Sequence, residues 1–436
     1  TRAQITASDA RFSSWLTANA GSGKTKVLID RVARLLLEGV QPEQILCLTY
    51  TKSAAAEMKN RLFDRLGKWA MLADQELNFS LLEMGIQQQL GTEELKKART
   101  LFARAIEAPG GLKIQTIHSF CSSLLRKFPL EAGISPQFGE LTERGQRDLF
   151  LKVLDILSAD EATEDSFEHF SKIANASNWE ETVSKIVSKR NIFSKSKSRA
   201  EIYEAFSISC EASIEDDISS HFQNSTLSFL RKISACLQRS TSKADQKISK
   251  EVSKISSIDL ISLPLLEKIF LYGKTAKAPF TAKLGKFSTK EMRTGLLADY
   301  IDDIDDFMVR LETFRDRRLS YQAAETSFSI HKFASAFLKV YTEQKKFKGL
   351  LDFDDLINIA VNLLTTSAVA DWVLYRLDGG IDHILVDEAQ DTSPSQWKVI
   401  ETLAQELLSG QDIHGSRSRT VFVVGDQKQS IYSFQG

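Results

Sequence analysis

The sequence predicts an α/β fold in which a parallel β-sheet carries a phosphate-binding loop and a large α-helical domain is inserted. Three observations lead to this prediction. Residues 18–25 read Ala-Asn-Ala-Gly-Ser-Gly-Lys-Thr between a strand-like run and a helical pattern. Other short apolar runs are typical of buried parallel strands, and each ends in polar residues. Residues from about 140 to 345 lack such runs and repeat Leu, Ile and Phe at helical spacing.

The glycine-rich stretch at 18–25 is the strongest chemical signal. A turn of this kind aims backbone N–H groups and the positive end of a helix dipole at one point, which favours phosphate binding. Lys24 is placed to reach the β- and γ-phosphates of a nucleotide, and the Thr25 hydroxyl to hold Mg²⁺. An unrelated glycine-rich turn would not explain the lysine and the hydroxyl together. We therefore predict a phosphate site made of Ala18, Asn19, Ala20, Gly21, Ser22, Gly23, Lys24 and Thr25.

The strand-like runs share one arrangement, an apolar segment followed by polar residues. In an open parallel sheet, ligands bind beyond the carboxyl ends of the strands, so these polar residues are expected to meet at one site. The runs lie at 15–16, 45–48, 113–117, 384–386 and 421–424. A helix is predicted over 53–66, which is rich in alanine, and another after Ser393-Pro394-Ser395-Gln396, which has the pattern of an N-cap, a first-turn proline and a capping box.

The run that ends in Asp387 and Glu388 carries a second chemical signal. Hydrolysis of a nucleoside triphosphate needs a carboxylate near Mg²⁺ and a base that orients the attacking water. Asp387 and Glu388 suit these two roles in that order. A surface Asp-Glu pair at a strand end is the alternative, and the phosphate loop in the same chain favours the catalytic interpretation. His383 is expected to be structural.

The totals set limits on the class of protein. A chain of 436 residues, 42% hydrophobic and 26% charged, is typical of a globular protein with two or three domains. Its formal net charge of -1 means that an anionic partner must be bound by a local patch. The four cysteines form no C-x-x-C pair, and no apolar run is long enough to span a bilayer. A cytoplasmic location is the simplest interpretation.

The predicted helical insertion contains a basic segment. From Arg231 to Arg293 there are 14 Lys or Arg residues against 5 Asp or Glu residues. This excess favours a surface that faces nucleic acid, whereas a solvated helix pair or a linker through 240–257, rich in Ser and Lys, remains the alternative. The acidic run of Asp302, Asp303, Asp305 and Asp306 is expected to be a solvated helix face and not a metal site.

Two further stretches bring a known family into view. Residues 387–392 read Asp-Glu-Ala-Gln-Asp-Thr, and residues 425–434 read Gly-Asp-Gln-Lys-Gln-Ser-Ile-Tyr-Ser-Phe. With the phosphate loop and with the motifs at 48–58, 116–121 and 351–356, the chain resembles the UvrD/Rep-type superfamily 1 DNA helicases. It is most similar to the AddA/RecB branch, the helicase-nuclease subunits of double-strand-break repair. The motifs cover about 1–135 and 350–436, and the middle of the chain is similar in position only.

The resemblance implies a fold and a nucleotide site. It implies a RecA-like sheet domain, called 1A, at 1–140 and 346–436, and a helical insertion, called 1B, at 141–345. It implies ATP and Mg²⁺ as cofactors and Gln4 as the residue that reads adenine. Lys24 and Thr25 then hold phosphate and Mg²⁺. The remaining implied roles are metal binding by Asp387, water activation by Glu388, and coupling of hydrolysis to DNA by Gln429.

The resemblance also implies a path for single-stranded DNA. Aromatic platforms suit strands that are bound without regard to sequence, because every base has a face that can stack. Phe434 matches the aromatic on which a base stacks. Tyr50 replaces the Phe of many relatives and keeps the ring, whereas Gln435 stands where the family usually has Arg. The positions that match the path are Thr49, Tyr50, Thr116, His118, Tyr432 and Phe434.

Since the family carries a second RecA-like domain beyond this point, we expect the chain to lack the arginine fingers that domain supplies. An arginine finger is worth about 10³–10⁵ in rate in related enzymes, so the chain should bind ATP and single-stranded DNA but hydrolyse ATP slowly, if at all. The parent protein is expected to be an ATP-driven helicase that acts at DNA ends with a second, AddB-like subunit; an exonuclease activity of the parent is left open, and no membrane is expected.

Two other classes of function stay open. A P-loop kinase or GTPase would share residues 18–25 and an acidic strand end, but it would not need residues 116–118 or 429–434. A non-enzymatic module for DNA binding or partner docking would use the basic insertion as its working surface. Substitution of Lys24 separates the second class from a motor, because a pure binding module would not respond to it.

Overall fold

The computed structural model describes residues 2–17, 23–86, 90–109, 111–174, 178–209, 213–366, 368–378, 380–409, 418–426 and 428. The chain divides into two compact units. One, which we call the sheet unit, contains Thr1–Gln146 and Lys345–Gly436. The other, which we call the helical unit, contains Arg147–Gln344. The 1A and 1B boundaries predicted from the sequence remain a prediction, and each unit is described by itself below.

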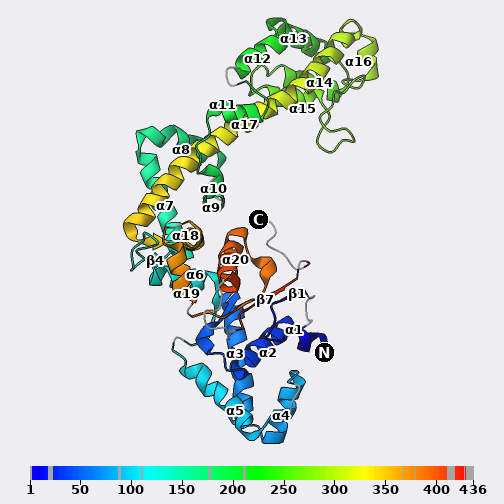
Figure 1. Cartoon of the computed structure of the whole chain (residues 1–436). Helices are drawn as coiled ribbons and strands as arrows, with labels where there is room; N and C mark the ends of the chain where they lie inside the picture. Colours follow the sequence, from blue (N-terminus) through cyan, green and yellow to red (C-terminus); the bar gives the residue numbers. More distant parts are fainter. Residues whose placement is uncertain are drawn as a thin grey trace. The chain divides into compact units, whose positions relative to one another are not determined.

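The sheet unit is built on a five-stranded sheet in the order β1-β7-β6-β2-β3, and every neighbouring pair is parallel. Figure 1 labels two of these strands, β1 and β7. The predicted α/β fold with a RecA-like parallel sheet is confirmed. One boundary differs, because Ile117 begins a helix and Thr116 caps it. The strands are β1 (Ser14–Thr17), β2 (Ile45–Thr49), β3 (Lys113–Thr116), β6 (His383–Val386) and β7 (Thr420–Gly425).

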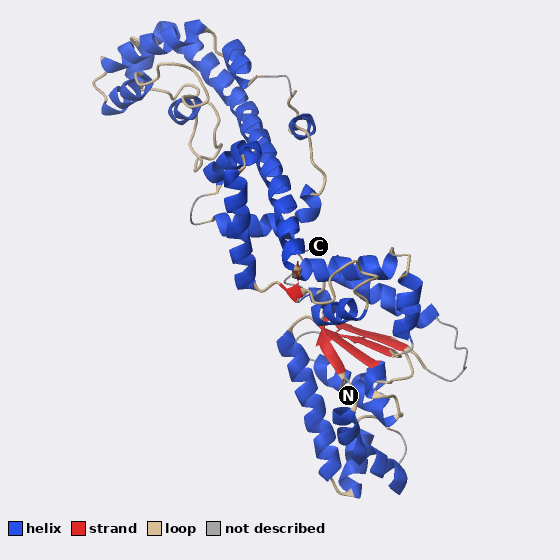
Figure 2. Cartoon of the chain, turned by 90° about the vertical axis from the view of Figure 1, so that its left-hand side faces the viewer, coloured by secondary structure: helices blue, strands red, loops and turns tan. Residues whose placement is uncertain are grey.

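Helices cover both faces of this sheet (Figure 2). Alternate residues of a strand point to opposite faces, so one strand contributes to two cores. In β2, Ile45 and Cys47 pack against α2, α3 and α5, whereas Leu46 and Leu48 pack against α6, α18 and α20. All four side chains are fully buried. This two-sided burial explains why the strand is a continuous apolar run without polar alternation.

The helices of the sheet unit follow the predicted positions closely. The helix predicted over 53–66 is part of α3, and the one that follows the phosphate loop is α2. Among the described residues, no single helix is both long and apolar enough to cross a membrane; α18 and α19 pass that test only as a pair bent by 100°. The helices are α1 (Arg2–Ala7), α2 (Lys24–Leu37), α3 (Lys52–Met71), α4 (Asp74–Glu83), α5 (Thr92–Glu107), α6 (Ile117–Lys127), α18 (Phe353–Thr365), α19 (Ala370–Asp378) and α20 (Pro394–Ser409), with 3-10 turns at Pro42–Gln44 and Ala389–Asp391.

The predicted start of α20 is confirmed in atomic detail. Gln396 N donates to Ser393 Oγ at 3.3 Å, and Ser393 N donates to Gln396 Oε1 at 3.0 Å. Pro394 is the first helical residue, where its missing N–H costs nothing. The capping box thus fixes where the chain turns from the Asp387-Glu388 segment into a helix.

A buried arginine joins the amino ends of the strands. Arg31 on α2 is fully buried and donates to the Asp9 and Phe12 carbonyls, each at 2.6 Å, and to Thr420 Oγ1 at 3.0 Å. Arginine is a donor only, so the single hydroxyl proton of Thr420 is left for His383 Nδ1, which lies 2.8 Å away. His383 is therefore a buried, neutral, structural histidine, as the sequence predicts.

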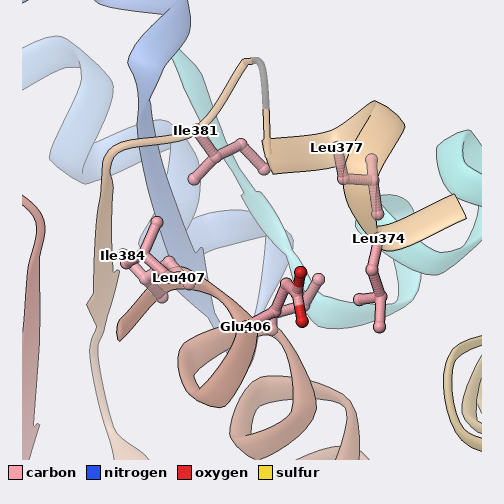
Figure 3. Close-up of a pocket in the computed structure, with 7 residues that line it drawn as sticks. Leu374, Leu377, Ile381, Ile384, Glu406 and Leu407 are labelled. Atoms are coloured by element: carbon pink, nitrogen blue, oxygen red, sulfur yellow. The ribbon is translucent and has the colours of Figure 1, made fainter. Parts of the chain in front are cut away.

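A small apolar cavity lies between α19, α20 and β6 (Figure 3). Its volume of about 20 Å³ is close to the space of one water molecule, and Leu374, Leu377, Ile381 and Leu407 are among its lining residues. The cavity is a packing gap of the core and not a ligand site.

The helical unit contains helices and one isolated bridge, between Leu271 and Ala282, in the part that the structure describes. Its longest element is α17, a helix of 48 residues without Gly or Pro, of which the last four, 345–348, are counted with the sheet unit. The helix ends before Gly349, whose φ is 61°. Phe170 stacks on Phe333 at a centroid distance of 3.9 Å. The helices are α7 (Glu143–Ala159), α8 (Glu161–Ile173), α9 (Trp179–Ser188), α10 (Arg190–Phe193), α11 (Arg199–Ala205), α12 (Ile214–His221), α13 (Asn224–Gln238), α14 (Lys243–Val252), α15 (Leu263–Phe270), α16 (Lys290–Thr294) and α17 (Ile301–Lys348), with a 3-10 turn at Ala298–Tyr300.

The basic segment of the helical unit is folded, so the linker interpretation of 240–257 is wrong. Helix α14 occupies most of it, and buried Asp245 accepts from Ser240 Oγ and from Thr289 Oγ1. The stretch 268–290, which we call the lysine loop, contains six lysines and no acidic residue. It is anchored by Ala282 N, which donates to Glu312 Oε2 at 2.8 Å. Its basic side chains are therefore carried by an ordered scaffold.

The sheet unit also contains a short parallel pair, β4 (Gly139–Glu140) and β5 (Leu350–Leu351). Next to β5, buried Lys345 is paired with the carboxylates of both Asp352 and Asp355. Asp352 and Asp355 also form the capping box of α18. Two acidic residues of the 351–356 motif are thus committed to holding a lysine and a helix start.

The neutral state of His383 makes the stability of the sheet unit depend on pH. Burial, assisted by the charge of Arg31, lowers the pKa of His383 to about 4, against about 6.5 in an unfolded chain. As the pH falls, the unfolded chain binds the extra proton before the folded chain does. The contribution of His383 to the free energy of unfolding is therefore fully present above about pH 6.5 and is lost as the pH falls toward 4. We expect a loss of about 2 kcal/mol between pH 7 and pH 5.

Urea unfolding at the two pH values measures this loss. A His383→Gln variant should lose less stability than the unsubstituted chain over the same interval, because the group that takes up the proton on unfolding is gone. An equal loss in His383→Gln and the parent would contradict the assignment.

Candidate nucleotide site

Because the five strands are parallel, their carboxyl ends form one edge of the sheet. Thr17, Thr49, Thr116, Val386 and Gly425 are the last residues of the strands. Helix α2 begins at Lys24, after Gly23, whose φ of 83° is readily accessible only to glycine. The start of α2 therefore adds the positive end of a helix dipole to this edge.

Three predicted residues meet here. Lys24 is 8% exposed, and its Nζ lies 3.8 Å from Glu388 Oε2. Asp387 N donates to Leu48 O at 2.9 Å, which continues the ladder between β6 and β2 past the end of the strand. Glu388 N donates to Asp387 Oδ1 at 3.1 Å. The lysine and both carboxylates are thus brought together, and Thr25 follows in the first turn of α2.

The carboxylate of Asp387 is short of positive charge. Its burial raises its pKa to about 6, the negative charge of Glu388 adds to this, and Lys24 offsets only part of it. A divalent cation beside Asp387 would favour its ionised form, and carboxylate and hydroxyl oxygens are suitable ligands for Mg²⁺. The described residues contain no group of three or more His, Cys, Asp or Glu that could hold a metal. A magnesium ion would then take further ligands from phosphate and water, as is usual for this metal.

The backbone at Glu388 is unusual. Its φ of 53° and ψ of 46° place it in the left-handed region, which non-glycine residues rarely adopt away from functional sites. Gln390 connects this residue to β7: Gln390 Nε2 donates to Glu388 Oε2, and Gln390 Oε1 accepts from Asp426 N at 2.8 Å. A Cβ on Gly425 would lie 3.2 Å from that oxygen, so the close approach favours glycine. Sequence reasoning assigned no role to Gln390.

Gln4 also reaches this region, although it precedes the loop by about twenty residues. Its Nε2 atom lies 3.0 Å from the position that a Cβ on Gly23 would take. Helix α1 thus places a side-chain amide against the residue that precedes Lys24. The other predicted phosphate-loop residues, Ala18, Asn19, Ala20, Gly21 and Ser22, lie outside the described residues, as do Gln429, Tyr432, Phe434 and Gln435.

Two threonines predicted to contact DNA are buried in turns. Thr49 is fully buried, and its hydroxyl donates to Thr51 O at 3.1 Å. Thr116 is 4% exposed and caps α6 by accepting from Ser119 N at 3.1 Å. These two hydroxyls hold the turns that follow β2 and β3. Tyr50, the residue after Thr49, is half-buried. A DNA role for any of these residues remains a prediction.

A basic groove of about 250 Å³ lies beside these turns. The exposed residues Lys52 and Lys59 on α3 line one side, and Gln115, Thr116 and Ser119 lie on the other. Lys52 stands at the start of α3, next to the carboxyl edge of the sheet, whereas the Lys59 ammonium lies two turns further along the helix, 5.7 Å from the centroid of the Phe63 ring. A groove lined by two lysines suits a phosphodiester backbone. Neither lysine was selected from the sequence, because exposed lysines on a helix are common and carry no signal by themselves.

His118 is paired with an aromatic residue that sequence reasoning missed. Its ring meets that of Phe353 edge-on at a centroid distance of 5.2 Å. Burial lowers the pKa of His118, and Glu140 offsets part of this effect, so the ring is held in its neutral form. Phe353 is 48% exposed. The signal was present in the 351–356 motif, where Phe353 is the aromatic residue between the acids that cap α18.

Comparisons with known proteins agree with this geometry. The model of the UvrD/REP helicase N-terminal domain matches residues 2–436. The chain is 25% identical to the AddA subunit of the ATP-dependent helicase/nuclease of Lactobacillus acidophilus, over 96% of this chain and 35% of the relative. It is 26% identical to the protein of that name in Enterococcus faecalis, over 96% of this chain and 33% of the relative. It is 24% identical to the exonuclease/helicase subunit RexA of Lactococcus lactis, over 96% of this chain and 35% of the relative.

The chain therefore spans about a third of the length of the curated relatives it matches. The predicted resemblance to the UvrD/Rep-type helicases and their AddA branch is confirmed by a family match across nearly the whole chain. With the phosphate-loop lysine, the paired carboxylates and the parallel sheet in place, this chain belongs to the UvrD/REP helicase family.

Proposed function

We propose that the chain is the ATP-binding part of a DNA helicase that moves on single-stranded DNA during double-strand-break repair and recombination. The observation that carries this proposal is the convergence of Lys24, Asp387 and Glu388 at the carboxyl edge of the sheet. Lys24 and Thr25 bind the phosphates and Mg²⁺, with Asp387 as the second metal ligand. Glu388 orients the attacking water, and Gln429 couples hydrolysis to DNA.

We assign the adenine-reading role to Gln4, because its amide lies against Gly23 at the start of the phosphate site. The magnesium-bound phosphates supply the electrophile, and the buried Lys24 compensates the charge that develops on them. The Glu388 carboxylate is held by its backbone and by Gln390, so the base is already oriented when the nucleotide binds.

Single-stranded DNA is proposed to cross the same edge of the sheet. Lys52 and Lys59 contact its phosphates, while Tyr50, Phe353 with His118, and Phe434 with Tyr432 offer rings to its bases. Domains 1A and 1B correspond in this proposal to residues 1–140 with 346–436, and to residues 141–345. Within the helical unit, the six lysines of the lysine loop are proposed to face nucleic acid as well.

The longer protein is proposed to be a cytoplasmic helicase-nuclease that works at DNA ends with an AddB-like subunit. The names of the relatives describe one subunit of a helicase/nuclease, which supports a nuclease and a further subunit for those proteins. Cys47 and Cys121 are buried free thiols, which suits a reducing compartment. A second candidate, a non-enzymatic DNA-binding module, is favoured only by the lysine loop. Another class of P-loop NTPase is less favoured, because it would not need residues 429–434.

Substitution of Lys24 tests the nucleotide site. Lys24→Ala should weaken binding of Mg-ATP about 10- to 100-fold, because a charge-assisted contact to phosphate is lost at a buried position. Lys26→Ala, an exposed lysine two residues along the same helix, is the matched control and should leave binding unchanged. The measurement is a titration with Mg-ATP, together with ATP turnover with and without single-stranded DNA.

Turnover by the chain alone is expected to be at background, with or without DNA. Equal binding of Mg-ATP by the parent and Lys24→Ala would reject the nucleotide site and favour the binding-module alternative. If DNA stimulates ATP turnover by the unsubstituted chain but not by Lys24→Ala, the second RecA-like domain is less necessary for hydrolysis than proposed.

The DNA path is tested at its rings. Phe353→Ala and Phe434→Ala should each weaken the binding of a fluorescent oligothymidylate about fivefold or more, because a stacked base contributes about 1–3 kcal/mol. Phe79→Ala is the control, since Phe79 is an exposed phenylalanine on α4 that is 64% accessible. If all three variants bind the oligonucleotide equally, the rings do not stack on DNA.

A further inference from the structure

The end of helix α4 has a geometry that only glycine satisfies well. Gly85 follows α4 with a φ of 90°. Its N–H donates to Leu82 O at 2.9 Å, and Ile86 N donates to Leu81 O at 3.3 Å. These two bonds are those of a Schellman motif, in which the residue after the C-cap adopts the left-handed conformation. The left-handed turn aims the Cα of Gly85 away from its own helix.

The neighbour that Gly85 meets is helix α1. A Cβ at Gly85 would lie 2.1 Å from Ile5 Cγ2 and 2.8 Å from Arg34 Nη2. Real atoms do not approach so closely, and Ile5 Cγ2 is attached directly to a branched Cβ whose rotation is restricted. Any side chain at position 85 must therefore displace Ile5, and with it the backbone of α1.

Other contacts fix both helices that meet at Gly85. Helix α4 is fixed to the core by Leu77 and Leu81, which are at most 1% exposed. Helix α1 has six residues, too few to be stable alone, and it depends on Arg34. Arg34 Nη1 donates to Ile5 O and to Ser8 Oγ, each at 3.0 Å. A displacement at Gly85 would therefore move α1 and not α4.

Helix α1 carries Gln4 next to Ile5. The Gln4 amide lies beside Gly23, one residue before Lys24. Contacts thus run from Gly85 through Ile5 to Gln4 and so to the start of the phosphate site. Lys24 itself is held by α2, whose Val27, Leu28 and Val32 are buried in the core, so it does not depend on α1.

We propose that Gly85 is a positioning residue for recognition of the nucleotide base: its contact with Ile5 sets the position of Gln4, while the phosphates are held independently by Lys24. This inference rests on the proposed function, in which Gln4 reads adenine. The α4–α5 hairpin, which lies between α3 and β3 in the chain, then takes part in nucleotide selection without touching the nucleotide.

The test compares two glycines with the same backbone and different surroundings. Gly39, which follows α2, has a φ of 95° and nothing within 4 Å of its Cβ position. Gly85→Ala and Gly39→Ala therefore introduce the same backbone strain, but only Gly85→Ala introduces the clash. The full chain is titrated with Mg-ATP, Mg-GTP and magnesium tripolyphosphate, and circular dichroism with a thermal melt checks that each variant folds.

We expect Gly85→Ala to weaken Mg-ATP binding about tenfold, the effect of one misplaced polar contact, and to leave tripolyphosphate binding within about twofold. The preference for ATP over GTP should fall with it. Gly39→Ala should lower the melting temperature but change none of the three affinities.

The outcomes separate this inference from the function beneath it. If the parent binds neither ATP nor tripolyphosphate through Lys24, the proposed function fails and this inference fails with it. If the parent binds ATP, GTP and tripolyphosphate equally, or if Gly85→Ala and Gly39→Ala behave alike, the phosphate site stands and the role of Gly85 is rejected. Should Gly85→Ala not fold, Ile5→Met changes the other partner of the same contact. This variant must weaken the binding of Mg-ATP and leave the binding of magnesium tripolyphosphate unchanged.

Discussion

The structure depends on the parallel register of its central sheet. Because Leu48 pairs with Val386, the hydrogen bond from Asp387 N to Leu48 O fixes the acidic pair one step beyond the strand end. The same constraint brings the turns after β2, β3 and β7 to one edge, where the start of α2 supplies the lysine. No local interaction could place residues more than 360 positions apart in the sequence with comparable accuracy. The chemistry of the site is therefore a consequence of strand order.

Charge balance at this edge is left incomplete by the protein itself. Lys24 offsets only part of the cost of burying Asp387 next to Glu388, and the pKa of Asp387 remains raised. At the opposite ends of the strands, Arg31 is also deeply buried, yet carbonyl and hydroxyl oxygens satisfy its two terminal nitrogens. The two ends of the strands thus use buried charge differently. Arg31 links segments of the fold, whereas the Asp387 carboxylate favours a bound cation.

Much of the sheet unit could be predicted because its signals are local. Apolar runs marked the strands, and the Ser393–Gln396 capping box marked the start of α20. The contribution of Gly85 could not be foreseen, because its meaning lies in a contact with Ile5, eighty positions away in sequence. Phe353 was visible in a motif but acquired a role only when the fold set it against His118. Helix α14 could not be foreseen for a different reason: its lysines favour a helix, whereas its serines favour caps and turns, so the composition of 240–257 points both ways.

The pairing of β4 with β5 has a consequence for how such a chain can be assembled. Residues 139–140 and 350–351 lie side by side within the sheet unit, and the whole helical unit falls between them in sequence. The two points at which the sheet unit would be cut and rejoined are therefore already neighbours. A few residues could bridge β4 and β5, so the two parts of the sheet unit could be joined without the helical unit at a small cost in loop-closure entropy.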